Sequence, residues 1–412
     1  MTTARRALII GAGIAGPATA LALQKAGIEP IIYERHLDTA DDVGVMLTVA
    51  TNGIDALCTL DADGAALAES FATPGIELRS YTGKRLGMTA TGSTRDGSRL
   101  SRTIKRADLY RALRDLALDR GIPIVRGREL VTAVPDGAGV RATFADGSEA
   151  RGDVLIGCDG IRSTVRGIID PSAPAPAYSG LITTGGYATG VDTGAAPGEY
   201  EMIFGRRAFF GHATAPSGEV WWFVNVPSRP EPDGRALRAV STAEWRTRLQ
   251  DLYAGDYGPA LEIIAATGDF PPMTPIHTMP RLTRWHRGPM VITGDAAHAP
   301  SPTSGQGASL SIEDGVVLAK CLRDLPDTEA ALAAFEAIRR PRVERIVKAA
   351  ARINNSKAAG PVARVIRDAM LPLVLRQATD SRSNAETFEH RIDWDAPANP
   401  EAYRGARGRT AA

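Results

Sequence analysis

A glycine-rich turn between two apolar runs restricts the fold of this chain more than any other feature. The apolar run Ala7–Ile10 is typical of a buried parallel strand, and Gly11, Gly13 and Gly16 follow it in the spacing G-x-G-x-x-G. A helix-forming segment then leads to a second apolar run that ends at Glu34. This order of strand, turn, helix, strand and acidic residue predicts a dinucleotide site.

Each part of the turn has a physical reason. The first glycine permits a tight turn, the second lets the backbone approach a pyrophosphate, and the third lets the helix pack close to the strand. The free N–H groups at the helix start, around Ile14 and Ala15, form an anion site together with the helix dipole. Glu34 stands where a carboxylate binds ribose hydroxyls, and Arg35 beside it can flank the adenine or the phosphates. A carboxylate at this place fits either NAD or FAD.

Composition bounds the function class. A length of 412 residues suggests two or three domains, and 48 basic against 47 acidic residues leave no electrostatic footprint for nucleic acid. The three cysteines are too scattered for a disulfide framework or a metal site, so we expect no metal. Because there is neither a long apolar run nor a secretory signal pattern, we expect no stable membrane insertion and a cytoplasmic location.

Two further motifs follow apolar runs. The segment 106–121 predicts an amphipathic helix that begins with Arg106, an unusual place for a cation because the helix dipole favours acidic residues there. Asp159 and Gly160 follow the run DVLIG, at a strand end of the kind that binds ligands in α/β sheets, although a lone Asp-Gly pair is more often an ordinary turn.

The composition changes between about 178 and 270, where aromatic-rich, strand-like segments alternate with turns. This pattern predicts an antiparallel sheet with helices at 242–254 and 259–267, and the segment 76–90 adds strands to it. Its aromatic residues are mostly expected in the core, with a subset that can line an apolar pocket. These residues are Phe204, Phe209, Phe210, Trp221, Trp222 and Phe223.

The stretch GDAAHAPSPTSGQG, from Gly294 to Gly307, lies between an apolar run and a helical segment. Read alone, it is either a polar connecting loop or a cofactor cradle. Helices are then expected at 312–322, 328–337, 340–354 and 361–378, and the last thirty or so residues are expected to be an extended tail.

In this fixed order, GAGIAG with Glu34, CDGIRSTVR and GDAAHAPSPTSGQG resemble the single-component FAD-dependent aromatic hydroxylases, the family of para-hydroxybenzoate hydroxylase. The resemblance covers roughly residues 5–350. It implies an α/β fold in which a Rossmann-like FAD-binding domain is interrupted by an antiparallel β-sheet substrate domain, with a helical C-terminal region. The expected FAD-binding domain comprises 1–75, 98–177 and 272–345, the substrate domain 76–97 and 178–271, and the C-terminal helices and tail 346–412.

The resemblance also implies residue roles. The glycine turn cradles the FAD pyrophosphate, Glu34 holds the adenosine ribose with Arg35 beside it, and Arg106 reaches the FAD phosphates and ribityl chain. Asp159 and Gly160 serve both FAD and the reduced nicotinamide, with Arg162 as a helper. The resemblance also implies a contact of the Gly44-Val45 segment with the flavin ring. The other implied cofactor contacts lie in or directly after the third motif. They are Gly294, Asp295 on the ribityl hydroxyls, Pro302, Gly305, and the helix start Gly307, Ala308 and Ser309.

The implied chemistry uses NADH or NADPH and O₂ to hydroxylate or epoxidise an aromatic or other electron-rich apolar small molecule through a flavin C4a-hydroperoxide. Pro302 is the single catalytic assignment, as a wall at the flavin edge rather than an acid or base. His212, Tyr187 and Arg206 are read as structural, and His298 as a hydrogen-bonding partner. Two alternatives stay open: a reductase or dehydrogenase of the same fold, similar to polyprenyl reductases, and a flavin-binding protein without catalysis.

Overall fold

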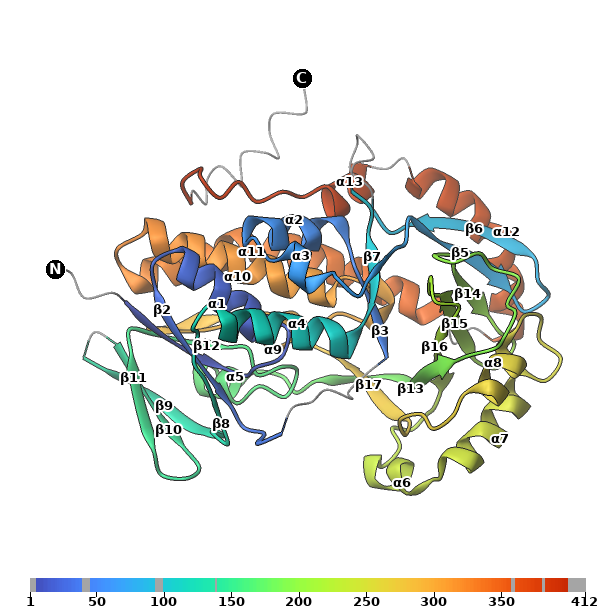
Figure 1. Cartoon of the computed structure of the whole chain (residues 1–412), viewed down its shortest axis with the longest axis horizontal. Coiled ribbons are helices and arrows are strands. Elements are labelled where there is room, and N and C mark those ends of the chain that lie inside the picture. The colour runs from blue at the N-terminus through green and yellow to red at the C-terminus, as the bar shows by residue number, and fades with distance from the viewer. Residues whose placement is uncertain are drawn as a thin grey trace.

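The computed structural model describes residues 5–38, 45–92, 99–137, 139–356, 360–379 and 382–398. Within these residues the strands form four sheets, and the two largest lie toward opposite ends of the long axis of the molecule (Figure 1). None of the helices in the described ranges is long and apolar enough to cross a membrane.

A six-stranded sheet contains the glycine turn. Its core strands are parallel, and β1 lies in the middle with Leu8 opposite Leu155 on one side and Ile31 on the other. Each of these three neighbouring strands contains a run of apolar residues, as expected for strands of a parallel sheet that is buried on both faces. The order is β18 (His286–Arg287), β19 (Met290–Ile292), β12 (Val154–Gly157), β1 (Arg6–Ile10), β2 (Glu29–Glu34) and β8 (Ile124–Arg126).

Helices α1 (Ala15–Lys25) and α10 (Gly307–Asp324) pack tightly against each other beside this sheet. Gly315 makes this possible, since a Cβ atom there would lie 2.9 Å from Cα of Thr19. The same region contains α2 (Thr51–Thr59), α3 (Asp63–Ala66), α4 (Arg106–Asp119), α5 (Thr164–Ile169), α9 (Asp295–His298), the 3₁₀ turn η1 (Pro302–Ser304) and α11 (Thr328–Ser356). Two small three-stranded sheets complete it: β11 (Glu149–Gly152), β10 (Gly139–Phe144) and β9 (Leu130–Asp136), and β3 (Met46–Val49), β7 (Arg102–Lys105) and β4 (Phe71–Ala72).

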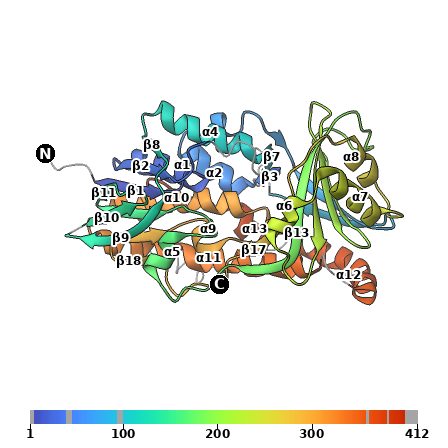
Figure 2. The ribbon, with the colours of Figure 1, turned by 90° about the horizontal axis from the view of Figure 1, so that it is seen from below.

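The second large sheet has seven strands and is seen edge-on at the right of Figure 2. Its order is β17 (Thr274–Thr278), β13 (Ala177–Ala188), β16 (Val220–Pro227), β15 (Phe209–Thr214), β14 (Tyr200–Phe204), β5 (Gly75–Ser80) and β6 (Arg85–Ala90). One face packs on α7 (Thr242–Tyr253) and α8 (Ala260–Ala266), with α6 (Gly234–Ala239) nearby, through Phe210 and Trp222. The other face carries Phe209 and Trp221.

Several expectations from the sequence need correction here. The seven-stranded sheet is not wholly antiparallel, because β14 pairs with β5 in parallel. The two helices expected on either side of residue 339 are one helix, α11, which runs through Pro341. A proline inside a helix removes a hydrogen bond, but the neighbouring Arg339 and Arg342 are both held by the buried carboxylate of Glu313.

The C-terminal part also differs from the extended tail that we expected. Helix α12 (Pro361–Thr379) is followed by α13 (Arg382–Phe388), which contacts α2. The chain then returns along α10, where Nζ of Lys320 donates to the main-chain oxygen of Asp393 and Ile392 is buried. Long-range side-chain contacts, which local composition does not reveal, fix this segment. The domain boundaries drawn from the sequence stay a prediction.

Candidate functional site

The glycine turn has the geometry that its spacing predicts. Gly11 has a φ of +102°, and a Cβ atom there would lie 2.6 Å from the carbonyl oxygen of Cys158. A Cβ atom at Gly16 would lie 2.0 Å from the carbonyl oxygen of Gly11, so only glycine lets α1 begin this close to β1. Gly13 faces open space, with nothing within 4 Å of its added Cβ. The backbone at this glycine is therefore free to approach a ligand.

Glu34 joins the end of β2 to this turn. Its Oε2 accepts a hydrogen bond of 2.8 Å from the N–H of Ala12, and its Oε1 accepts one of 2.9 Å from the N–H of His36. The carboxylate is half-buried beside the turn, where the prediction needs it for a ribose. Arg35 is exposed next to it, with Nε 3.0 Å from Nε2 of His36.

Asp159 lies at the end of β12, next to β1. Its Oδ2 accepts a hydrogen bond of 3.1 Å from the N–H of Val165, which fixes the start of α5. Its Oδ1 is buried and has no hydrogen-bond partner among the described residues. Burial raises the pKa of this carboxyl group. Asp159 thus has a structural role through one oxygen, while its other oxygen is left without a partner among the described residues, and Gly160 has a φ of +74°.

Asp295 begins α9, directly after Gly294, whose φ of +57° turns the chain out of the strand region. The Asp295 side chain is exposed to solvent, yet burial of its position raises its pKa, while His298 and Arg106 act in the opposite direction. The Asp295 carboxylate is thus accessible to a ligand, although protein surrounds its position. Arg106, at the start of α4, is close enough to influence this carboxylate, so the fold brings together two residues 189 positions apart.

The predicted flavin-facing helix start is also present. Helix α10 begins at Gly307, with Gln306 as its N-cap residue, and Gly305 before it has a φ of +59°. Ser309 is buried, and its Oγ accepts a hydrogen bond of 3.1 Å from the N–H of Ala50, which ties the helix to α2. Pro302 is exposed in η1 before the helix. The free N–H groups of this helix start suit an electron-rich carbonyl.

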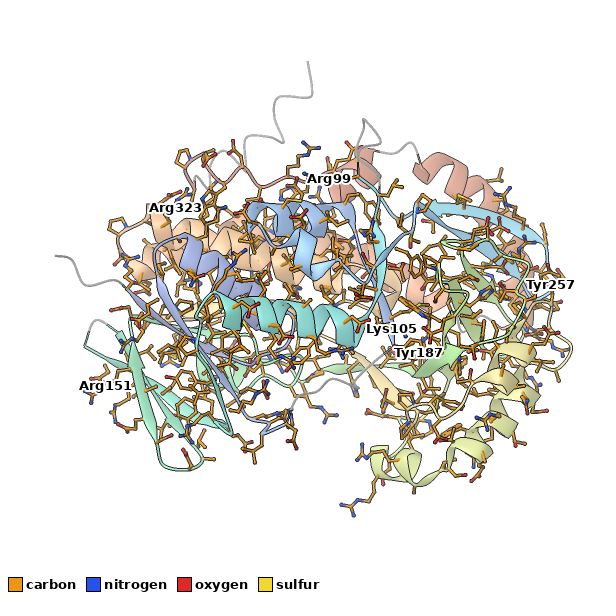
Figure 3. All side chains as sticks on the ribbon, viewed as in Figure 1. Arg99, Lys105, Arg151, Tyr187, Tyr257 and Arg323 are labelled. Atoms are coloured by element: carbon orange, nitrogen blue, oxygen red, sulfur yellow. The ribbon has the colours of Figure 1, made fainter. Side chains whose placement is uncertain are left out.

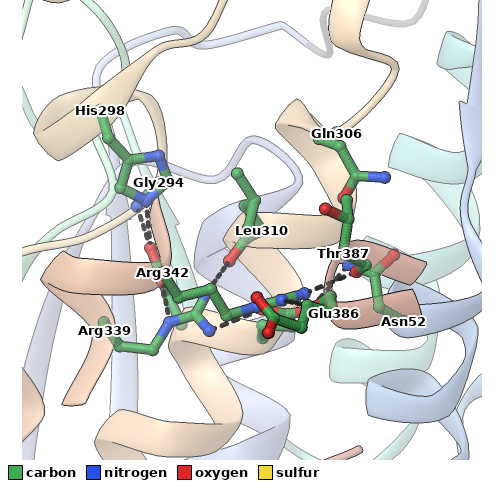
Figure 4. A network of polar contacts seen from close by, with 11 residues as sticks. Asn52, Gly294, His298, Gln306, Leu310, Arg339, Arg342, Glu386 and Thr387 are labelled. Carbon is green, nitrogen blue, oxygen red and sulfur yellow. Dashed lines mark hydrogen bonds and ion pairs between the residues drawn. The ribbon is translucent and has the colours of Figure 1, made fainter. Parts of the chain in front are cut away.

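A buried polar network lies behind this helix start (Figure 4). Nε2 of His298 lies 2.6 Å from Oδ2 of Asp314, and the same oxygen accepts a hydrogen bond of 2.9 Å from the N–H of Gly294. Arg339 binds Asp314 through Nε at 2.7 Å and Glu313 through an Nη at 2.6 Å. His298 is therefore a hydrogen-bonding partner of Asp314, in agreement with the structural role that the sequence analysis gave it.

Glu313 is the centre of the rest of the network. Its carboxylate accepts hydrogen bonds from Arg342 at 2.7 and 3.0 Å and from Nδ2 of Asn52 at 2.6 Å. Despite burial, the two arginines hold the pKa of Glu313 far below its ordinary value. Asn52 also contacts Gln306 at 3.1 Å, so the network reaches the N-cap of α10. Buried ion pairs of this kind fix one arrangement of the surrounding elements.

Sequence reasoning missed Glu313, Asp314 and the arginines that bind them. It also missed Arg166, which donates hydrogen bonds to the main-chain oxygens of Ala296 at 3.0 Å and Ile161 at 2.8 Å, and so ties α9 to the Asp159 turn. One available signal was the pair of acidic residues in SIEDG inside an otherwise apolar helix, because charged residues are seldom buried without partners.

The seven-stranded sheet meets the cofactor region at Val45. The main-chain oxygen of Val45 accepts hydrogen bonds from the Tyr187 hydroxyl at 2.8 Å and from the N–H of Arg106 at 3.0 Å. Nζ of Lys105 lies 4.2 Å from the centre of the Tyr187 ring and 2.7 Å from Oε2 of Glu219. Lys105 and Tyr187 are labelled in Figure 3. Gly44 lies outside the described residues. These contacts place the Phe209 and Trp221 face of the sheet beside Arg106.

These residues fit FAD on four observations: the open space at Gly13, the unpartnered Oδ1 of Asp159, the accessible but surrounded carboxylate of Asp295, and the free helix start at Gly307. Residues 5–350 match the FAD binding domain family. The chain belongs to this family. The recognition made from the three motifs is thereby confirmed, and FAD is the expected cofactor.

Two relatives of this chain are named as oxygenases. Aurachin C monooxygenase/isomerase of Stigmatella aurantiaca is 32% identical over 355 residues, which cover 86% of this chain and 90% of that protein. A FAD-dependent urate hydroxylase of Klebsiella pneumoniae is 31% identical, with 83% and 88% covered. The expected enzyme class, a flavoprotein monooxygenase, is confirmed by these relatives.

A solved structure supports the fold class. Klebsiella pneumoniae HpxO in complex with FAD and uric acid superimposes with a TM-score of 0.80 at 25% identity, covering 93% of this chain and 97% of that one. The roles of individual residues, from Gly11 and Glu34 to Pro302 and Ser309, stay predictions.

Proposed function

We propose that this chain hydroxylates or epoxidises an aromatic or other electron-rich apolar small molecule, with NADH or NADPH as reductant and O₂ as oxidant. FAD supplies the oxygen-activating chemistry when it is bound. The observation that carries the proposal is the link between the Asp295 carboxylate and an aromatic sheet face: Arg106 acts on Asp295, and its N–H shares the main-chain oxygen of Val45 with the Tyr187 hydroxyl of that face.

The residues of the chain have distinct tasks in this proposal. Asp295 and Arg106 hold the ribityl chain and phosphates, Glu34 holds the adenosine ribose, and the helix start at Gly307 stabilises negative charge on the adjacent ring carbonyl. Pro302 is a wall of the reaction space rather than a proton donor.

In this proposal the sheet face that carries Phe209 and Trp221 binds the substrate and excludes water. It is apolar and rich in aromatic rings, which favours a flat aromatic ligand over a charged one. The relatives act on molecules as different as urate and zeaxanthin, so the identity of this chain's substrate rests on its own side chains. Those that line this face are Met46, Phe71, Tyr187, Met202, Phe209, Trp221 and Phe223.

No described residue on this face is assigned as a general base. The Tyr187 hydroxyl donates a hydrogen bond to the main-chain oxygen of Val45, and burial raises the pKa of Tyr187, so this side chain stays protonated. His212 is fully buried in β15 and, by strand alternation, shares the α7 and α8 face with Phe210. The structural reading of both residues is therefore kept.

The test is a turnover assay on the purified flavin-loaded protein. Candidate aromatic compounds are screened for stimulated NADH or NADPH oxidation in the presence of ¹⁸O₂, and the product is examined by mass spectrometry. Incorporation of one labelled oxygen atom is the expected result. A reduced product without label would instead support a reductase, and flavin binding without turnover of any candidate would support a non-catalytic binder. A protein that takes up no FAD would overturn the proposal.

A further inference from the structure

Three charged side chains of α12, those of Arg364, Arg367 and Asp368, lie on the side of the helix that faces the protein. Arg364 donates a hydrogen bond to the main-chain oxygen of Arg206. The guanidinium carbon of Arg367 lies 4.3 Å from the centre of the Phe204 ring, and its side chain is paired with Asp368. On an ordinary surface helix such charged groups meet water instead.

The apolar side chains of α12 divide between two faces: Leu371 and Leu375 pack against the seven-stranded sheet, whereas a second set points away from the protein. Five large ones recur at helical spacing on this outer face, and small Ala363 and Ala369 stand exposed between them. They are Val362, Val365, Ile366, Met370 and Leu373, with exposed fractions of 75%, 72%, 53%, 57% and 63%. We call these seven residues the α12 stripe. It holds five of the twelve large exposed apolar side chains found in the described residues.

The position of α12 makes the stripe available to a partner. The helix packs on β6, the edge strand of the seven-stranded sheet, and lies at the rim of the molecule in both ribbon views (Figures 1 and 2). Met88 of β6, itself 50% exposed, adds one more apolar side chain on this strand. Contiguous exposed apolar surface of this kind marks an interaction site in a natural protein.

No described residue covers the stripe, since each of its five large side chains keeps more than half of its surface exposed.

The chemistry of the stripe favours protein over lipid. Helices that lie in a membrane surface combine aromatic anchors with basic residues that reach lipid headgroups. The stripe has no aromatic residue, and Arg364, Arg367 and Lys84 are already bound to groups of this chain. An uncharged stripe of mixed small and large aliphatic residues is, in contrast, complementary to itself, because ridges of one copy fit the grooves of another. With a formal net charge of +1, two copies also repel each other little.

We propose that the α12 stripe is the contact surface of a two-fold dimer of this chain. In an isologous contact each residue meets the same patch on the second copy. The axis then passes near the middle of the stripe, between Ile366 and Ala369, and the two α12 helices run antiparallel. The proposal is independent of the substrate.

Sedimentation velocity of the full-length, flavin-loaded protein tests this, over roughly 1–100 µM because dimerisation follows mass action. The expected result is a species of twice 43.6 kDa at the higher concentrations. The double variant Ile366→Glu, Met370→Glu should be monomeric over the same range, with unchanged circular dichroism, flavin absorbance and melting in dilute solution. Leu118→Glu, which replaces an apolar residue of α4 that is 48% exposed, is the matched control and should remain dimeric.

A cysteine variant tests the position of the axis. Ala369→Cys should form a disulfide-linked dimer under mild oxidation, whereas Leu118→Cys and the unaltered chain should not. A wild-type protein that is monomeric at every concentration would overturn the proposal, as would a double variant that still dimerises. Flotation of a monomeric wild type with phosphatidylglycerol vesicles would also overturn it and would assign the stripe to a membrane surface.

Discussion

His298 and Asp314 form a fully buried pair, with Nε2 of the histidine 2.6 Å from Oδ2 of the aspartate. The pair joins α9, where Asp295 begins the predicted ribityl contact, to α10, whose start is predicted to face the flavin ring. Arg339 of α11 binds the other oxygen of Asp314 at 2.7 Å. The placement of the candidate site therefore depends on a buried polar network whose side chains are not among the predicted cofactor contacts.

Removing the charge of Asp314 should destabilise the protein strongly. Asp314→Asn leaves the Arg339 guanidinium with an incomplete set of partners in the core, at a cost of roughly 3–5 kcal/mol in the free energy of unfolding. Urea unfolding measures this. Asp324→Asn, on the same helix but partly exposed, is the control and should cost less than about 1 kcal/mol. Equal effects of the two substitutions would contradict the importance that we give to the network.

The hydroxyl of Tyr187 should help to position Val45. Tyr187→Phe removes a hydrogen bond to the main-chain oxygen of Val45, worth about 1 kcal/mol, and should weaken FAD binding by roughly fivefold. Flavin fluorescence quenching gives the dissociation constant. Tyr178→Phe on the same strand removes a similar bond to Ser228 and should leave FAD affinity unchanged. If both variants bind FAD like the wild type, the contact at Val45 does not support the cofactor.

Two glycines of the turn should respond differently to alanine. Gly16→Ala places a Cβ atom 2.0 Å from the carbonyl oxygen of Gly11, so the apoprotein itself should lose roughly 1–3 kcal/mol of stability. Gly13→Ala meets no atom within 4 Å, so the apoprotein should keep its stability while FAD affinity falls. Thermal unfolding without FAD and a flavin titration separate the two effects. A Gly13→Ala protein with normal FAD affinity would place the pyrophosphate elsewhere.

Burial of His212 should make stability depend on pH. Its pKa is lowered from 6.5 to about 4 by burial, so between these values the unfolded chain binds a proton that the folded chain does not. The free energy of unfolding should therefore fall as the pH decreases through this window, with about 2 kcal/mol of the loss between pH 7 and pH 5 due to His212.

Chemical denaturation of His212→Leu at these two pH values tests the assignment. The variant should lose less stability at pH 5 than the wild type does, although His390, whose pKa burial also lowers to about 4, keeps part of the dependence in both proteins. His36→Leu replaces an exposed histidine and is the control. An unchanged difference between pH 7 and pH 5 in His212→Leu would show that another group is responsible.

The sequence by itself determined the local geometry of the candidate site. The turn at Gly11–Gly16 was predictable because a positive φ and a close backbone approach are requirements of single residues. The helix starts at Arg106 and Gly307 were predictable because periodicity and turn residues are local signals. Three such motifs in order were sufficient to identify the FAD-binding family.

The tertiary structure decided everything that depends on distant partners. Local propensity predicts a break near Pro341, yet α11 continues because arginines on both sides of the proline reach Glu313 in another helix. Periodicity shows that α12 has an apolar face but not which way that face points, and the contacts of Arg364 and Arg367 turn it outward. The direction of a helix face and the pairing of buried charges are set by the whole fold, since burial and long-range ion pairs outweigh local preference.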